Sequence, residues 1–88
     1  MLEKVLKIQN KMGLHARPAA MFVQTANRYK SEVFLIKNGI EANGKSVMGL
    51  MMLAAEHGSE ILLRVWGDDE KQALCALENL FSNKFSEE

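Results

Sequence analysis

Several features that would place the chain outside the cell interior or in a membrane are scarce or lacking. Its 88 residues include one cysteine, Cys75, which cannot form a disulfide within the chain and so agrees with a reducing compartment. No run of about 18 apolar residues is present, and residues 1–15 lack the long apolar core of a signal peptide. We therefore expect a cytoplasmic protein that does not enter membranes.

An excess of charge of one sign is also lacking, because 11 Lys and Arg residues balance 11 Asp and Glu residues. This balance argues against a nucleic-acid binder, which normally carries a strong positive charge. The charges are unevenly placed, however. Residues 1–45 carry eight basic and three acidic side chains, whereas residues 46–88 carry three and eight. The basic half would attract acidic partners, although a solvated surface with no such role explains the pattern equally well.

The length and the apolar periodicity predict one α+β domain that spans residues 1–88. The Asn38-Gly39 pair predicts a type I′ hairpin, because both turn positions need positive φ. The predicted elements are a strand at 2–8, a helix from 16 to about 29, strands at 32–37 and 40–42, a short helix from 47 to 52 or 53, a strand at 60–66 and a final helix capped by Asp68 or Asp69. Their order, β-α-β-β-α-β-α, favours an open-faced β-sandwich with three helices on one face of the sheet.

The same periodicity predicts which side chains are buried and where the helices end. Buried positions are expected at Ala19, Phe22, Val23, Ala26, Leu50, Leu53, Ile61, Leu63, Val65, Ala73, Leu74, Leu77, Leu80 and Phe81. His57-Gly58 is expected to end the short helix. Cys75 is expected to pack within the last helix, and residues 82–88 are expected to fray.

The segment Gly13-Leu14-His15-Ala16-Arg17-Pro18-Ala19 carries the strongest functional signal. Proline fits only the first turn of a helix, so Pro18 places the helix start at Ala16 or Arg17 and His15 at or beside the N-cap. There the backbone amides lack partners within the helix and the helix dipole is positive. Phosphate suits such a position, because the amides and the forked Arg17 side chain can all bind its oxygens. We therefore interpret His15 as a phosphoryl acceptor; an isolated histidine here would more often be a capping or loop residue.

A second stripe on the first helix is small and uncharged, and it begins beside His15. Together with the apolar side chains of the short helix it is a candidate partner-binding surface, since flexible methionines suit a surface that meets several partners. Read alone, the stripe fits ordinary surface and the methionines fit core packing. The candidate residues are Ala16, Ala20, Gln24, Asn27, Val47, Met48 and Met51.

No cofactor or metal site is expected. His15 and His57 could pair on a metal only with further Cys, His or carboxylate ligands at useful spacing, and none are present. Ser46 is a good N-cap for the short helix, and that structural role is sufficient to explain it.

Gly-Leu-His-Ala-Arg-Pro-Ala closely resembles the phosphorylation motif of HPr, the histidine phosphocarrier of the bacterial sugar phosphotransferase system. Asn38-Gly39, the segment Gly44-Lys45-Ser46-Val47-Met48-Gly49-Leu50 and the overall length also match. The resemblance implies a four-stranded antiparallel sheet with strand order 1-4-2-3. It further implies that Nδ1 of His15 takes a phosphoryl group from enzyme I, originally from phosphoenolpyruvate, and passes it to sugar-specific enzyme II A components. Arg17 and the amide of Ala16 would contact the phosphoryl oxygens.

The resemblance also implies a regulatory role for Ser46. That residue matches the serine phosphorylated by a dedicated HPr kinase/phosphorylase, and Val47 and Met48 match versions that bind a catabolite-control transcription regulator. A carrier that moves between partner proteins in this way is expected to work best as a monomer. Two other interpretations stay open: a regulatory interaction module switched at Ser46, and a small domain that binds an anionic metabolite.

Overall fold

The computed structural model describes residues 1–86, and its elements follow the predicted order. They are β1 (Leu2–Lys7), α1 (Ala16–Ala26), β2 (Glu32–Lys37), β3 (Ile40–Asn43), α2 (Val47–Met52), β4 (Glu60–Trp66), α3 (Glu70–Ser82) and a 3-10 turn (Lys84–Ser86).

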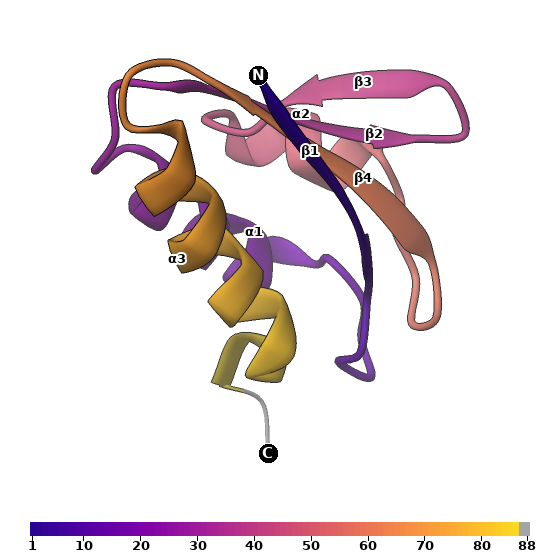
Figure 1. Cartoon of the computed structure of the whole chain (residues 1–88). Helices are drawn as coiled ribbons and strands as arrows, with labels where there is room; N and C mark the ends of the chain where they lie inside the picture. Colours follow the sequence, from indigo (N-terminus) through magenta and orange to yellow (C-terminus); the bar gives the residue numbers. More distant parts are fainter. Residues whose placement is uncertain (87–88) are drawn as a thin grey trace.

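The strands form one antiparallel sheet in the order β1-β4-β2-β3, as predicted. The three α-helices cover one face of this sheet (Figure 1). β4 lies between β1 and β2, so that Leu63 is opposite Lys4 on one side and Leu35 on the other. The chain therefore has the expected open-faced α+β sandwich.

The β2–β3 hairpin closes through the predicted turn. Asn38 and Gly39 have φ values of 51° and 80°, which are the two positive values that a type I′ turn requires. This turn fixes the register in which Lys37 lies opposite Ile40.

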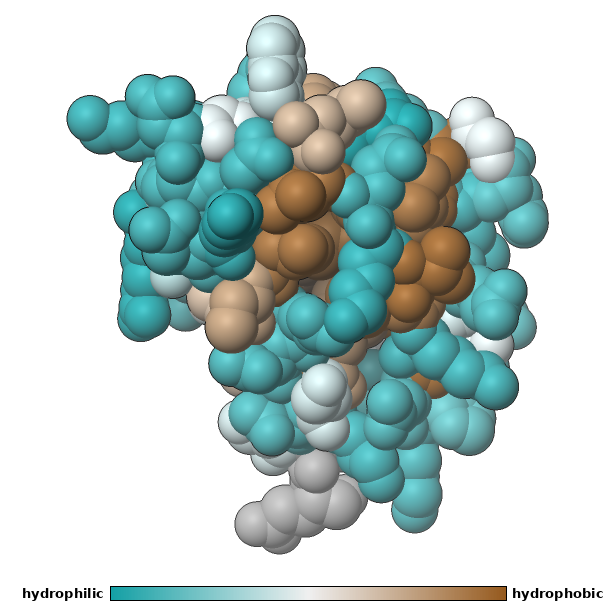
Figure 2. Space-filling view, viewed as in Figure 1, coloured by the Kyte–Doolittle hydropathy of each residue, from teal (hydrophilic) through white to brown (hydrophobic). Residues whose placement is uncertain are grey.

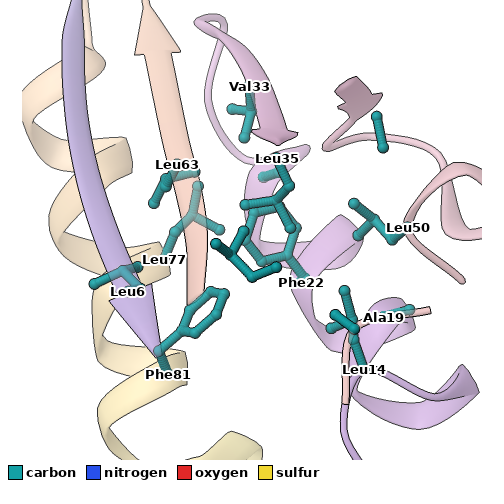
Figure 3. Close-up of a cluster of buried hydrophobic side chains, with 14 of the residues drawn as sticks. Leu6, Leu14, Ala19, Phe22, Val33, Leu35, Leu50, Leu63, Leu77 and Phe81 are labelled. Atoms are coloured by element: carbon teal, nitrogen blue, oxygen red, sulfur yellow. The ribbon is translucent and has the colours of Figure 1, made fainter. Parts of the chain in front are cut away.

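The core lies between the sheet and the helices (Figure 3). The ring of Phe22 projects from α1 towards Leu35 of β2 and Leu50 of α2, and it meets Phe81 of α3 edge-on with ring centroids 6.2 Å apart. Apart from Leu74 and Leu80, which are partly buried, every side chain predicted to be buried is so. Burial of each large aliphatic or aromatic side chain stabilises the fold by about 1.5–3 kcal/mol.

The opposite face of the sheet is exposed to solvent. Its side chains include Val5 and Trp66. On the same face Arg64 of β4 forms ion pairs with Glu3 of β1 (2.7 Å) and Glu41 of β3 (3.2 Å), so that these pairs link three strands. Figure 2 shows hydrophobic patches separated by hydrophilic side chains on the side of the molecule seen in Figure 1.

The first helix ends earlier than predicted. α1 ends at Ala26 instead of Tyr29, because the amides of Arg28 and Tyr29 bond to carbonyls three residues back, at Thr25 and Ala26, which tightens the chain into turns. Arg28 and Lys30 therefore lie beyond the last turn of α1.

α2 ends at Met52, within the predicted bounds of 47 to 52 or 53, so the expectation that His57-Gly58 ends this helix was wrong. Ala54 adopts φ of 51°, which breaks the helix, and Nζ of Lys37 donates to the carbonyls of Leu53 (3.3 Å) and Ala54 (2.9 Å) at the helix end. His57 and Gly58 belong instead to the turn before β4, where the Gly58 amide donates to the Ile8 carbonyl at 2.8 Å.

Asp69 occupies the N-cap of α3, one of the two predicted positions, but its side chain does not cap that helix. Its carboxylate instead accepts hydrogen bonds from the hydroxyl and amide of Ser31 and from the amide of Lys30. The Ser31 hydroxyl, with help from these amides, lowers the pKa of Asp69. Asp69 thus ties the start of α3 to the start of β2.

The prediction that the C-terminal segment frays was wrong for the described residues up to Ser86. Lys84, Phe85 and Ser86 form a left-handed turn, with φ between 52° and 60°, and Phe85 is 2% exposed. Its ring centroid lies 5.2 Å from that of Phe81. Left-handed backbone costs about 1–2 kcal/mol per residue, a cost that burial of the ring offsets. Residues 87 and 88 lie outside the described residues.

Cys75 is exposed, so the prediction that it packs within α3 was wrong. The buried face of the helix passes through Ala73, Leu77 and Phe81, and Cys75 lies on a different face.

Replacing Phe85 by Ala is expected to lower the free energy of unfolding by about 3 kcal/mol, because a large buried ring is lost from the core. Urea unfolding measures this loss. Ser86→Ala, in the same turn but exposed, is the control and should change stability little. Equal stability of the Phe85→Ala variant and the unaltered chain would show that the turn frays.

Candidate functional site

His15 is the N-cap residue of α1, as the sequence predicts. Its backbone is extended (φ −84°, ψ −171°), its carbonyl accepts the first helical bond from Ala19 at 3.0 Å, and its side chain makes no capping hydrogen bond. The side chain is partly exposed. The imidazole is therefore available to another molecule instead of closing the helix end.

The residues after His15 supply donors around it. Ala16 and Arg17 begin the helix, where amides have no acceptor within the helix, and Pro18 has no amide to leave unpaired. Arg17 is exposed, and within residues 1–86 its guanidinium has no hydrogen bond or ion pair. This end of α1 thus presents amide donors and a positive helix dipole at the N-cap histidine, and Arg17, two residues further on, carries an exposed guanidinium.

The loop before His15 is held against the segment that leads into β4. The Leu14 amide donates to the Ala55 carbonyl at 2.8 Å, and the Leu14 side chain is buried beside Ala19 (Figure 3). The buried Asn10 side chain donates to the Gly13 carbonyl. These contacts fix the direction in which the chain enters α1.

Gly13 is required at its position for two reasons. Its φ of 69° is left-handed, and a Cβ built there would lie 2.4 Å from the Ala55 carbonyl oxygen. Any larger residue would push the loop away from Ala55 and displace His15.

Ser46 caps α2, as predicted: its Oγ accepts a hydrogen bond from the Gly49 amide at 3.0 Å. The side chain is partly exposed. Negative charge is tolerated at such a helix start, so the local geometry accommodates a phosphate on Oγ.

The predicted partner surface is divided between two helices that pack against each other, α1 and α2. Ala16, Gln24 and Asn27 are exposed, whereas Ala20 is partly buried. On α2, Met48 is 72% exposed, Met51 is also exposed, and Val47 packs partly against the core.

Two exposed methionines, Met52 and Met12, are not among the predicted partner-surface residues. Met52, at 79% exposed, extends the α2 surface, and Met12, at 72%, lies in the loop before His15. The signal for Met12 was an apolar residue within an otherwise polar turn. Both add flexible apolar surface, which suits transient contacts.

Two absences apply to the part of the chain that the structure describes. Within residues 1–86 no group of three or more His, Cys, Asp or Glu side chains could hold a metal ion. None of the helices there is long and apolar enough to cross a membrane.

The fold and the site define a small α+β protein with a histidine at the N-cap of a helix. The histidine side chain makes no capping hydrogen bond, and the helix start suits a phosphate group. A family model described as the phosphorylation site of the HPr component of the phosphotransferase system matches residues 2–83. The chain belongs to the HPr family of phosphocarrier proteins.

Individual relatives agree with this assignment over most or all of their length. The phosphocarrier protein HPr of Treponema pallidum is 50% identical over 88 residues, which cover the whole of both chains. An HPr-like protein Crh of Halalkalibacterium halodurans is 53% identical over 88% of this chain and 92% of its own. The crystal structure of HPr-C-His from Thermoanaerobacter tengcongensis superposes with a TM-score of 0.96 at 46% identity, covering 100% of this chain and 99% of that one.

Replacing Gly13 by Ala is expected to lower the free energy of unfolding by more than a Gly→Ala change at a position with positive φ normally does. Gly39→Ala is the matched control, since Gly39 also has positive φ but nothing lies within 4 Å of the place that its Cβ would take. We expect about 1 kcal/mol for Gly39→Ala and at least about 2 kcal/mol for Gly13→Ala, measured by urea unfolding. Equal losses would show that the Gly13–Ala55 contact does not constrain the loop.

Proposed function

We propose that His15 accepts a phosphoryl group from phosphorylated enzyme I, charged by phosphoenolpyruvate, and transfers it to sugar-specific enzyme II A components. The observation that carries this proposal is the N-cap position of His15, whose side chain makes no capping bond and which directly precedes the first amides of α1 and the exposed Arg17. Membership of the HPr family supports the same chemistry.

The transfer step needs no other reactant. Nδ1 of His15 attacks the phosphorus of the donor's phosphohistidine, a new P–N bond forms, and the electron pair of the broken P–N bond returns to the donor ring. Such a transition state is loose, so that positioning and charge stabilisation matter more than covalent chemistry. The Arg17 side chain and the amides of Ala16 and Arg17 would stabilise the phosphoryl oxygens.

The partial exposure of His15 suits a carrier that must also release its cargo. A closed pocket with many donors would bind the phosphoryl group tightly and slow its transfer to the next protein. At the start of α1 few groups surround the ring, and none encloses it. Reversible loading and unloading follow from this arrangement.

The partners would dock over the surface formed by α1 and α2. Small and uncharged side chains next to His15 permit close approach, and the exposed methionines of α2 adapt to different partner shapes. We place enzyme I and the enzyme II A components on this same surface, acting in turn, with the protein working as a monomer in the cytoplasm. The surface residues are Ala16, Ala20, Gln24, Asn27, Val47, Met48 and Met51.

The first test is incubation with phosphoenolpyruvate labelled on phosphorus and enzyme I. The unaltered chain should gain one acid-labile phosphate, His15→Ala should gain none, and His57→Ala, which alters the other histidine, should keep the label. Phosphate on His15→Ala, or none on the unaltered chain, would contradict the proposal. The second result would favour a regulatory module or a metabolite-binding domain, since neither requires group transfer.

Ser46 is proposed as a regulatory site, phosphorylated by an HPr kinase/phosphorylase and then recognised, with Val47 and Met48, by a catabolite-control transcription regulator. A phosphate adds about −1.5 to −2 charges where the helix dipole of α2 tolerates them. The new charge would lie on the docking surface. It would therefore repel an acidic partner without refolding α2.

Ser46→Asp is expected to slow phosphorylation of His15 by enzyme I about threefold to tenfold, a change of about 1 kcal/mol in barrier height. Ser46→Asn is the matched control, because asparagine also caps helices but adds no charge. The rates are measured with the same labelled phosphoenolpyruvate at low and high salt. Equal rates for the two variants would contradict electrostatic control, as would a difference that salt leaves unchanged.

A further inference from the structure

A depression of about 360 Å³ lies where the end of β1 meets the turn before β4 and the C-terminal turn. Six residues from these three segments line it: Lys7, Ile8, Gln9, His57, Gly58 and Lys84. None of them belongs to the His15 site or to the α1–α2 surface. Its volume is within the range of small-ligand sites, which is about 300–1,000 Å³.

Among residues 1–86 the lining is basic and contains no carboxylate. Lys7 and Lys84 bring two ammonium groups from segments far apart in the sequence, and His57 brings an imidazole. Within residues 1–86 none of these three side chains has a hydrogen bond or ion pair. By contrast, Lys37 and Lys45 of the basic half are bound to backbone carbonyls.

The backbone here offers few free donors, so the side chains must do the binding. The Ile8 amide donates to the Ser59 carbonyl at 2.9 Å and the Gly58 amide to the Ile8 carbonyl at 2.8 Å. Ile8 itself is fully buried and anchors the wall of the depression. A ligand would therefore contact two ammonium groups, an imidazole and the Gln9 side-chain amide, next to a backbone whose amides are already hydrogen-bonded.

The nearest carboxylates in the chain sequence are Glu56 and Glu60, which flank His57 and Gly58 but do not line the depression. Glu60 lies opposite Lys7 in the β1–β4 register, yet the two form no ion pair. A cation would be repelled by the lysines, which excludes a metal site. Two lysines from separate segments instead suit an anion with charge at more than one point.

We propose that this depression binds a small anion carrying two or more phosphate groups, held by Lys7 and Lys84 with His57 and Gln9 as further donors. The site is independent of phosphoryl transfer at His15. Inorganic pyrophosphate and a sugar bisphosphate share the required chemistry.

The test is a titration of the His15→Ala protein with pyrophosphate, followed by amide NMR shifts, because that background removes the other anion-binding histidine. Saturable shifts at Lys7, Gln9, His57 and Gly58 are expected. A parallel titration with a sugar bisphosphate shows which source of phosphate binds more tightly.

Lys7→Gln/Lys84→Gln in the same background should weaken pyrophosphate binding about tenfold or more. Lys30→Gln/Lys71→Gln removes the same charge from exposed positions elsewhere and should leave the affinity within about twofold. Equal weakening in both double variants would show a general charge effect and overturn the proposal. Shifts that fail to saturate, or that centre on α1, would overturn it too.

Discussion

The hydrogen bond from the Leu14 amide to the Ala55 carbonyl is the contact on which the site depends. It joins the loop before α1 to the segment before β4, and Gly13 makes that approach sterically feasible. Since α1 is itself held by Phe22 and Ala19 in the core, both sides of His15 are fixed. The amides at the start of the helix are therefore fixed in position, which would reduce the reorganisation that the proposed transfer requires.

The same fold packs α2 against α1, with the chain after α2 bonded to the loop before α1 and Lys45, just before α2, bonded to the Tyr29 carbonyl beyond the end of α1. The N-cap of α2, Ser46, would present added charge at the surface proposed for docking. The proposed phosphoryl transfer and its proposed control would thus both act through the surface formed by α1 and α2. The residues that line the basic depression are not part of this surface.

Much of this fold is predictable because its helices, strands and turns are determined by residues that are close together in the sequence. Pro18 fixes the start of α1, Asn38-Gly39 fixes the hairpin, and alternation along residues 60–66 fixes the central strand. The strand order came from resemblance to HPr, since periodicity does not specify which strands are neighbours.

Predictions about individual residues failed mainly where a contact between segments far apart in the sequence determined the local structure. Asp69 binds Ser31 instead of capping its own helix, and Phe85 packs on Phe81 through a left-handed turn that propensity disfavours. Cys75 was misplaced because its neighbours in sequence are apolar, although the helix turns it outward. The roles proposed for Arg17 and Ser46 depend on partner proteins, which no pattern within the chain describes.

We expect the first amides of α1 to hold the phosphoryl group on His15. The amide NMR spectrum before and after phosphorylation by enzyme I tests this expectation. The amide protons of Ala16 and Arg17 should move strongly downfield, while that of Gly49, at the start of α2, should stay in place. Unchanged Ala16 and Arg17 resonances in a protein that carries phosphate on His15 would contradict it.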